Sequence, residues 1–425
     1  MDSMLVRGGR KLQGEIQAGG SKNATLPLMA ATLLTSEKSR LDNVPRLQDI
    51  FFMGKVLEHL GAKIEHTNGT LHVDPAELQD LEAPYELVRK MRASIYVLGP
   101  LLARFGRARV SLPGGCAIGN RPIDLHLKGF EALGAKIELD KGYVIATAPE
   151  GGLQGADCVI SGPSGSSVGA TCNVLMAAVL AKGKTILRGA AKEPEVNDLI
   201  ECLNGMGAKI EGAGTGMLEI EGVDALHGAE YKVIPDRIEA GTLLMAAAMT
   251  GGDIKVIECR PDHLEGPLEK MEEMGVEIES GDDWVRAQAR QPLRPISLRT
   301  LPYPGFPTDM QAQFLAALCL AEGESTITET IYPDRFMHVA ELNRMGARVT
   351  LAHATAVVRG IERYTGATVM ASDLRASAAL VLAGLAAEGE TEILRIYHLD
   401  RGYEKMEAKF RKLGADIERV TYHRR

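Results

Sequence analysis

The chain has 425 residues, enough for two or three domains of ordinary size. A net charge of -8 and an aromatic content of 4% argue against a nucleic-acid partner and against base-stacking surfaces. Six scattered cysteines without a C-x-x-C pair indicate reduced thiols and neither a disulfide framework nor a zinc site. Residues 1–16 lack the apolar core of a signal peptide, and the longest apolar runs are too short to span a bilayer. We therefore expect a cytoplasmic protein without membrane insertion.

A short phrase recurs six times along the chain. It reads Leu-Gly-Ala-Lys-Ile at 60–64 and at 133–137, and close variants follow with glycines at 207, 275, 346 and 414. Successive glycines are 68 to 73 residues apart, which is typical of a repeat architecture. Each copy ends an amphipathic helix pattern and begins a β-branched segment, so we expect a helix, a glycine stop and a strand in every repeat.

A second recurring element precedes each of these phrases. It is a helix pattern that is apolar on nearly every face, which is typical of a buried helix. The six segments are 23–34, 92–105, 168–181, 238–249, 309–321 and 374–387. Strand patterns follow most of them, so each unit of about seventy residues reads as strand, buried helix, strand, amphipathic helix, strand, strand. This predicts an α/β fold with helices inside and sheets outside.

Three repeats per domain is the simplest partition. It predicts one domain over 21–229 and a second over 1–20 and 230–425, because the strand at Met4 to Val6 joins the far domain and doubles the linker.

Cations stand where the buried helices begin. They are Lys22, Arg92, Arg237 and Arg375. Helix N-termini bind anions, and a cation there opposes the helix dipole, so we expect a bound anion that neutralises both. For the neighbouring Asp236 and Asp373, ordinary helix capping is the favoured interpretation.

A glycine-rich loop at 112–122 holds Cys116 and ends near Arg121. It is a longer version of the turns that carry Arg335 and Arg401 in repeats five and six. An insertion in the loop of one repeat is typical of a functional surface. Cys116 is either a reactive thiol or a small buried hydrophobe. Arg335 and Arg401 are either site residues or surface ion pairs with Asp334 and Asp400.

If these residues cluster, the ligand is a small, multiply charged anion held between the domains. Other motifs compete poorly. The stretch 162–167 lacks the ending of a Walker loop, and 212–216 reads as a hairpin turn. His126 and His338 read as structural residues of amphipathic helices.

These features resemble the enolpyruvyl transferases over essentially the whole chain. The resemblance rests on Ser-Lys-Asn-Ala at 21–24, Met-Arg-Ala-Ser at 91–94, Leu-Pro-Gly-Gly-Cys-Ala-Ile-Gly at 112–119, Arg-Pro-Ile-Asp-Leu-His at 121–126, Phe-Pro-Thr-Asp at 306–309, Arg-Phe-Met-His at 335–338, Asp-Leu-Arg-Ala-Ser at 373–377 and Asp-Arg-Gly-Tyr at 400–403. It implies a two-domain inside-out α/β barrel with the active site in the interdomain cleft. It also implies transfer of enolpyruvyl from phosphoenolpyruvate to the 3′-hydroxyl of UDP-N-acetylglucosamine, the first committed step of peptidoglycan synthesis, without a cofactor.

The resemblance also implies residue roles. Cys116 is the general acid, since a thiol of pKa ~8.5 is protonated at neutral pH. It is also the site of a covalent phosphoenolpyruvate adduct and of fosfomycin attack. Asp309 is the base on the 3′-hydroxyl, or orients it. The phosphoenolpyruvate site comprises Lys22, Asn23, Arg121, Arg375 and Arg401, and Lys22 and Arg401 also count as catalytic. The nucleotide-sugar site comprises Arg92, Arg121, Pro122, Ile123, Asp124, Leu125, Ser167, Val168, Gly169, Asp309 and Ile331.

One position departs from the family pattern. Gly165 stands two residues before Ser167, where a lysine is expected, and this affects the detail of diphosphate binding. Two alternatives stay open: transfer to another acceptor such as shikimate 3-phosphate, and a catalytically silent paralogue that only binds nucleotide sugar. The presence of Cys116, Asp309, Lys22 and the arginines speaks against the second.

Overall fold

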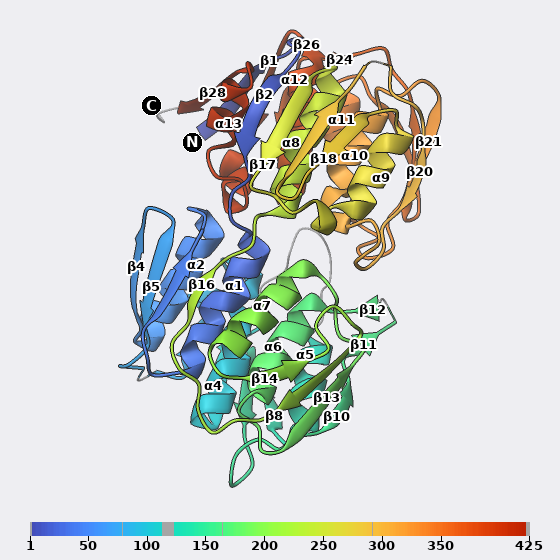
Figure 1. Cartoon of the computed structure of the whole chain (residues 1–425). Coiled ribbons are helices and arrows are strands. Elements are labelled where there is room, and N and C mark those ends of the chain that lie inside the picture. The colour runs from blue at the N-terminus through green and yellow to red at the C-terminus, as the bar shows by residue number, and fades with distance from the viewer. Residues whose placement is uncertain (1, 79, 113–122, 164, 291, 422–425) are drawn as a thin grey trace. The chain divides into compact units, whose positions relative to one another are not determined.

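The structure is a computed structural model of the chain, and it describes residues 2–78, 80–112, 123–163, 165–290 and 292–421 (Figure 1). These residues form two compact units. Unit 1 comprises residues 2–19 and 235–421, and unit 2 comprises residues 20–112 and 123–234. The unit boundary after Ile234 lies beyond the predicted boundary after Ala229, because strand β16 (Glu230–Lys232) pairs with β3 (Ser39–Asp42) of unit 2.

Among the described residues the strands form six four-stranded sheets, three in each unit. In unit 2, the first sheet has the order β16-β3-β5-β4, with β5 at Thr70–Asp74 and β4 at Lys63–Thr67. The second has the order β6-β7-β9-β8, with these strands at Glu82–Ala83, Arg107–Ser111, Tyr143–Thr147 and Lys136–Asp140. The third has the order β10-β13-β15-β14, with these strands at Asp157–Val159, Lys184–Arg188, Met217–Glu221 and Lys209–Glu211. In unit 1, the first sheet has the order β2-β17-β19-β18, with these strands at Gln13–Gln17, Asp253–Ile257, Trp284–Gln288 and Glu277–Ser280. The second has the order β20-β21-β23-β22, with these strands at Ser297–Arg299, Glu324–Thr328, Thr355–Arg359 and Arg348–Ala352. The third has the order β25-β27-β1-β28, with these strands at Thr368–Met370, Glu390–Leu394, Asp2–Arg7 and Asp416–Thr421. In every sheet the first pair is parallel and the other pairs are antiparallel.

The first strand of the chain completes the sheet of the last repeat. Val6 on β1 stands opposite Thr391 on β27 and Ile417 on β28. The predicted pairing of this strand with the far part of the chain is therefore present. Two short ribbons complete the strand set, β11 (Ser161–Gly162) with β12 (Gly165–Ser166) and β24 (Tyr364–Thr365) with β26 (Ala387–Glu388).

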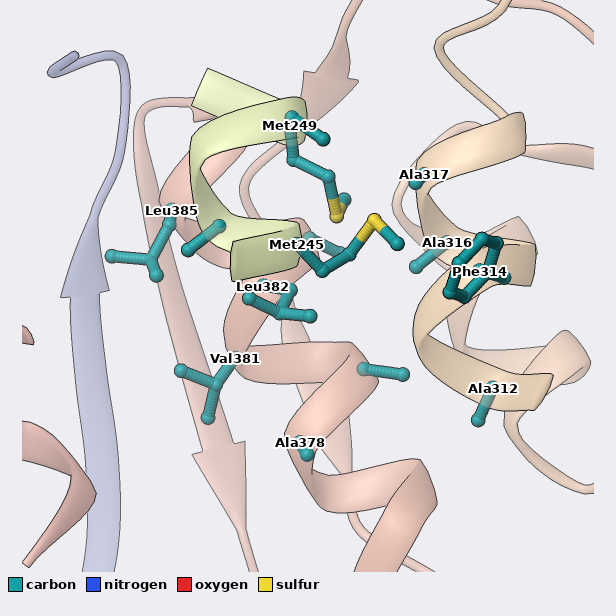
Figure 2. Packing of buried hydrophobic residues seen from close by; sticks show 14 of the residues in the cluster. Met245, Met249, Ala312, Phe314, Ala316, Ala317, Ala378, Val381, Leu382 and Leu385 are labelled. Carbon is teal, nitrogen blue, oxygen red and sulfur yellow. The ribbon is translucent and has the colours of Figure 1, made fainter. Parts of the chain in front are cut away.

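The predicted apolar helices are present and buried. Unit 2 contains α1 (Lys22–Ala31) continued by η1 (Thr32–Leu34), η2 (Arg92–Val97) continued by α4 (Leu98–Phe105), and α6 (Val168–Ala178). Unit 1 contains α8 (Arg237–Thr250), η4 (Thr308–Met310) continued by α10 (Gln311–Leu318), and α12 (Leu374–Ala386). In Figure 2, Met245 of α8 and Phe314 of α10 point toward one another, and Leu382 of α12 lies beside them. The helices are apolar all round because they pack against one another as well as against strands.

The recurring phrase ends six outer helices. They are α2 (Gln48–Leu60), α5 (Asp124–Ala132), α7 (Pro194–Gly205), α9 (Glu265–Glu273), α11 (His338–Arg344) and α13 (Met406–Lys412). Each is followed by the repeat glycine, with φ between 89° and 109°, a conformation that a side chain disfavours. The next residue bonds back to the helix, as in Ala62 N to Leu57 O at 3.0 Å and Ala415 N to Phe410 O at 3.0 Å. This is the Schellman arrangement, and it explains why glycine recurs there.

The mixed α/β class is therefore confirmed. Three further short helices are α3 (Tyr85–Val88), η3 (Pro261–His263) and η5 (Ile396–Arg401). The glycine-rich segment at 212–216 is the predicted hairpin turn between the antiparallel strands β14 and β15. Every helix in the described part of the chain is too short or too polar to cross a membrane.

Candidate active site

Asp309 lies in η4, at the start of a buried helix of unit 1, between two buried arginines. Its Oδ1 accepts a hydrogen bond from Arg335 Nη1 at 2.8 Å, and its Oδ2 accepts one from Arg375 Nη2 at 2.9 Å. The two arginine side chains are 6% and 3% exposed, whereas that of Asp309 is 27% exposed. Charge-assisted bonds to both oxygens orient the carboxylate, and one part of it still faces solvent.

Arg375 is held by its own network. It is the second residue of α12, and its Nη1 donates to the hydroxyl of Tyr403 at 3.2 Å. Tyr403 is buried and also contacts Thr242 Oγ1 at 3.0 Å and Gln313 Nε2 at 3.3 Å. Burial disfavours the charged form of Arg375, but the neighbouring Asp309, Tyr403 and Asp236 together outweigh this effect and raise the pKa of the guanidinium above its ordinary value, with Asp309 contributing most. The guanidinium therefore stays charged and fixed in place.

The surface alternative for Arg335 is wrong. Arg335 is buried and pairs with Asp309, while Asp334 is exposed. The alternative for Arg401 also fails in part, because Asp400 pairs with Arg419 of β28, with Arg419 Nη1 2.9 Å from Asp400 Oδ2. Arg401 itself is half-buried at the end of η5. Both arginines belong to unit 1.

The capping interpretation of two acids is confirmed. Asp236 accepts from the backbone N–H of Ile238 at 2.8 Å, and Asp373 accepts from that of Arg375 at 2.9 Å. Each side chain satisfies N–H groups that the first turn of a helix leaves without partners. Arg237 follows Asp236, is buried, and lies over the ring of Tyr303 at 5.6 Å.

Ile331 is held by a buried acid that the sequence did not single out. Its backbone N–H donates to Glu329 Oε1 at 2.9 Å, and Glu329 Oε2 accepts from Thr308 Oγ1 at 2.9 Å. Thr308 precedes Asp309, so Glu329 connects two predicted substrate-contacting segments of unit 1. The strand pattern contained a signal for it, because Ser325, Ile327 and Glu329 alternate onto the same buried face.

In unit 2, Lys22 begins α1, whose N-cap is Ser21. Its Nζ lies 3.4 Å from Oδ2 of Asp49, a buried acid in the first turn of α2. This carboxylate counters the repulsion between the lysine and the helix dipole. From the sequence we had expected a bound anion alone to do so. Asn23 is the next residue of α1 and is half-buried.

The predicted nucleotide-sugar residues of unit 2 lie at the starts of α5 and α6. Ser167 caps α6 by accepting from Ala170 N at 3.2 Å, and Val168 and Gly169 form the first turn. Asp124 and Leu125 begin α5, and the Leu125 side chain lies 3.7 Å from the position of a Cβ on Gly162 in β11. A Cβ on Gly169, in the first turn of α6, would lie 3.1 Å from Nε2 of His126, in the first turn of α5, so the two helix starts are neighbours. Ile123, just before α5, is buried.

Gly165 lies in the β11–β12 ribbon with a φ of 94°. A residue with a side chain rarely adopts this conformation, so the local backbone favours glycine over the lysine of the family pattern.

A buried amide connects α6 to its neighbours. Asn173 accepts from Gly99 N at 2.8 Å and donates to Ile95 O at 2.9 Å and to His126 Nδ1 at 3.1 Å. The acceptor role of Nδ1 assigns the ring proton to Nε2. Burial, and then the charge of Arg92, lower the pKa of His126 to about 4, so the ring is neutral at pH 7. His126 is thus structural, as predicted.

Three predicted residues, Cys116, Arg121 and Pro122, lie outside the described residues. The other five cysteines are buried as free thiols. Burial raises the pKa of each, to about 11 for Cys259 and about 12 for Cys202, so they remain protonated thiols. No group of three His, Cys, Asp or Glu side chains suited to a metal ion occurs in the part of the chain that the structure covers.

Comparison with known proteins identifies the class. The family model for EPSP synthase (3-phosphoshikimate 1-carboxyvinyltransferase) matches residues 6–410. The solved structure of the enolpyruvyl transferase NikO from Streptomyces tendae superposes with a TM-score of 0.88 at 28% identity, covering 99% of both chains. EPSP synthase from Acinetobacter baumannii shares the fold, with a TM-score of 0.76 at 18% identity over 99% of this chain and all of that one. The chain belongs to the enolpyruvyl transferase family.

Within that family, the chain resembles one type of enzyme at high identity. It is 56% identical over 423 residues to the UDP-N-acetylglucosamine 1-carboxyvinyltransferase of Gluconacetobacter diazotrophicus, covering 99% of this chain and all of that protein. It is 55% identical over 421 residues to the enzymes of the same name from Trichlorobacter lovleyi and Dichelobacter nodosus.

Proposed function

We propose that this cytoplasmic enzyme transfers the enolpyruvyl group of phosphoenolpyruvate to the 3′-hydroxyl of UDP-N-acetylglucosamine and releases phosphate. This would be the first committed step of peptidoglycan synthesis. The observation that carries the proposal is the identity of 55–56% over the full length to relatives that bear this activity in their name. The oriented carboxylate of Asp309 beside two buried arginines supports it, because the reaction needs a proton acceptor close to anion-binding groups.

The reaction proceeds by addition and elimination. The 3′-oxygen forms a bond to C2 of phosphoenolpyruvate, C3 takes a proton, and the hydroxyl loses one, which gives a tetrahedral ketal. Loss of a proton from C3 and cleavage of the C2–O bond to phosphate then restore the double bond. Cys116 serves as the acid at C3. Asp309 accepts the hydroxyl proton or orients the hydroxyl, a role that its partly exposed carboxylate allows.

The anion-binding roles follow the charges. Lys22, Arg121 and Arg401 hold the phosphate, Arg375 and Arg401 hold the carboxylate, and Asn23 completes the phosphoenolpyruvate site. Arg375 already donates to Asp309 and Tyr403, but its buried Nε has no hydrogen-bond partner among the described residues. This remaining donor supports its assignment to the carboxylate of phosphoenolpyruvate. Neutralising the phosphate stabilises its departure in the elimination step.

The residues assigned to the nucleotide sugar come from both units. Unit 2 contributes Arg92, residues 123–125 and residues 167–169, and unit 1 contributes Asp309 and Ile331. We propose that the two groups act on the same nucleotide sugar. We also propose that in each unit the three sheets surround the three buried helices as an inside-out α/β barrel, which the repeated sheet orders support.

The acceptor decides between the candidate activities. The purified protein is incubated with phosphoenolpyruvate and either UDP-N-acetylglucosamine or shikimate 3-phosphate, and phosphate release is followed. We expect release only with the nucleotide sugar. Release only with shikimate 3-phosphate would refute the proposal, and release with neither acceptor would favour a silent paralogue.

The acid assignment predicts different effects of two substitutions at Cys116. Cys116→Ser should abolish measurable turnover, because an aliphatic hydroxyl is a far weaker acid than a thiol. Cys116→Asp should retain activity, because a carboxyl group can still donate a proton. Buried Cys259→Ser is the control and should remain active. Activity of Cys116→Ser at the level of the unmodified enzyme would exclude Cys116 as the acid.

A further inference from the structure

Glu329 is a fully buried carboxylate that receives only neutral hydrogen-bond donors. It follows β21 and is 0% exposed. Its Oε1 accepts from Thr300 Oγ1 at 2.7 Å and from the backbone N–H groups of Ile331 at 2.9 Å and Tyr332 at 3.0 Å. Its Oε2 accepts from Thr308 Oγ1 at 2.9 Å. Within the described residues no cation pairs with it.

Such a group is costly for stability alone. Moving a carboxylate out of water carries a large desolvation penalty, and apolar residues often replace buried charges without loss of stability. The four hydrogen bonds offset part of that penalty, and they also order the groups that donate them. What Glu329 orders therefore indicates why it is there.

Three of the four donors belong to two segments that approach the Asp309 carboxylate; the fourth, Thr300, lies just after β20. The Thr308 hydroxyl donates to Glu329 and accepts from Arg335 Nη1 at 3.0 Å, and the same Nη1 donates to Asp309. On the other side, Glu329 holds Ile331 and Tyr332, and Tyr332 O accepts from the backbone N–H of Arg335 at 2.9 Å. A closed ring of hydrogen bonds thus connects Glu329, Thr308, Arg335 and the 331–335 turn, and Arg335 of this ring also donates to Asp309.

We propose that Glu329 is a positioning residue for the acceptor sugar. It fixes the separation between the Asp309 carboxylate and the Ile331 backbone, the two parts of unit 1 assigned to the nucleotide sugar. This inference rests on the proposed function. Because proton transfer and nucleophilic attack tolerate little displacement, loss of this support weakens both acceptor binding and turnover.

Two substitutions break the same bond from opposite ends. Thr308→Val removes the hydroxyl, and with it also the bond from Arg335 Nη1, and leaves the side-chain volume nearly unchanged. Glu329→Gln keeps one acceptor oxygen and places an NH₂ group opposite the Thr308 hydroxyl. Thr308→Ser restores the hydroxyl. The matched control is Thr328→Val, which removes the hydroxyl that contacts Thr355 Oγ1 at 3.0 Å on the neighbouring strand of the same sheet.

The experiment measures steady-state phosphate release by the full-length variants with both substrates varied, together with their thermal unfolding. Thr308→Val and Glu329→Gln should each raise the KM for UDP-N-acetylglucosamine about tenfold and lower kcat, the size expected for one buried bond to a charged group. The KM for phosphoenolpyruvate should change less than twofold. The double variant should lose less than the product of the single effects, because both remove one interaction. Thr308→Ser and Thr328→Val should match the unmodified enzyme.

Unchanged kinetic constants in Thr308→Val would overturn the proposal, and so would an equal effect of Thr328→Val or an equal rise in both KM values. If Glu329→Gln fails to fold, the Thr308→Val and Thr308→Ser pair decides. The unmodified enzyme is assayed first with the nucleotide sugar. Its inactivity would refute the proposed function, whereas an active enzyme with unaffected variants would refute the role of Glu329 alone.

Discussion

The start of α12 in unit 1 and the start of α6 in unit 2 both carry predicted substrate residues, but different interactions stabilise them. Around α12, charged groups neutralise one another, with the Asp309 carboxylate between the guanidinium groups of Arg335 and Arg375. Around α6, a neutral amide and a neutral imidazole, Asn173 and His126, connect the elements. Equivalent positions of a repeat can thus provide oriented charge in one unit and a rigid neutral support in the other. We therefore expect substitution of Asp309, beside the start of α12, to reduce turnover, and substitution of Asn173, in α6, to reduce stability.

Among the residues of this comparison, the largest effect is expected at Asp309. Asp309→Asn should lower kcat about 10³-fold, because an amide cannot accept the hydroxyl proton and its NH₂ group would face a guanidinium. The measurement is steady-state phosphate release with both substrates saturating. Asp334→Asn, which changes an exposed acid next to Arg335, is the control and should stay within twofold. A kcat for Asp309→Asn above a tenth of the original would show that this carboxylate only orients other groups.

Asn173 tests the other half of the comparison. Asn173→Ala leaves the Gly99 N–H and His126 Nδ1 buried without partners, so the free energy of unfolding should fall by about 3 kcal/mol. Urea unfolding followed by circular dichroism measures it. In Asn197→Ala, the lost partner Gly214 N lies in an exposed turn where water can replace it, and the loss should be about 1 kcal/mol. Equal losses in the two variants would contradict the role of Asn173 as a buried support.

Mild acid should distinguish the two units. Burial lowers the pKa of His338 in unit 1 and of His126 in unit 2 to about 4. In the unfolded chain the histidine pKa is near 6.5, so between pH 6.5 and pH 4 the unfolded chain binds more protons than the folded one. Each histidine should therefore lower the free energy of unfolding by about 2 kcal/mol when the pH falls from 7 to 5. In unit 2, burial raises the pKa of Asp198 to about 7. For Asp198 the folded state binds more protons than the unfolded chain. Acidification from pH 7 to pH 5 should therefore raise the free energy of unfolding through this group by about 2 kcal/mol.

The shifts of His338, His126 and Asp198 together predict that acidification from pH 7 to pH 5 destabilises unit 1 more than unit 2. Trp284, the single tryptophan, lies on β19 and reports urea unfolding of unit 1, while hydrogen exchange of α6 amides reports unit 2. Asp198→Asn removes the carboxyl group whose protonation opposes the effect of His126, and it should make unit 2 as acid-sensitive as unit 1. The same response of unit 2 with and without Asp198 would contradict this assignment.

Much of the fold follows from local patterns. The six buried helices and the glycine-terminated outer helices could be predicted because apolar periodicity and a positive φ depend on neighbouring residues. Asp236 and Asp373 were recognisable as caps for the same reason. Asn173 and Gln313 could have been noticed, since each is an amide inside an otherwise apolar buried helix.

The sequence by itself determined the repeat, the α/β class and the residue types that gather at helix starts, because steric and capping preferences act within a few residues. Only the tertiary structure decided which charges meet. The partners of Asp309 are 26 and 66 residues away in the chain, and β16 lies in unit 2 because it pairs with β3. Asp400 likewise pairs with Arg419, which is 19 residues further along the chain. Such pairings depend on how distant segments pack, since a charge binds whichever opposite charge the fold brings within hydrogen-bond distance.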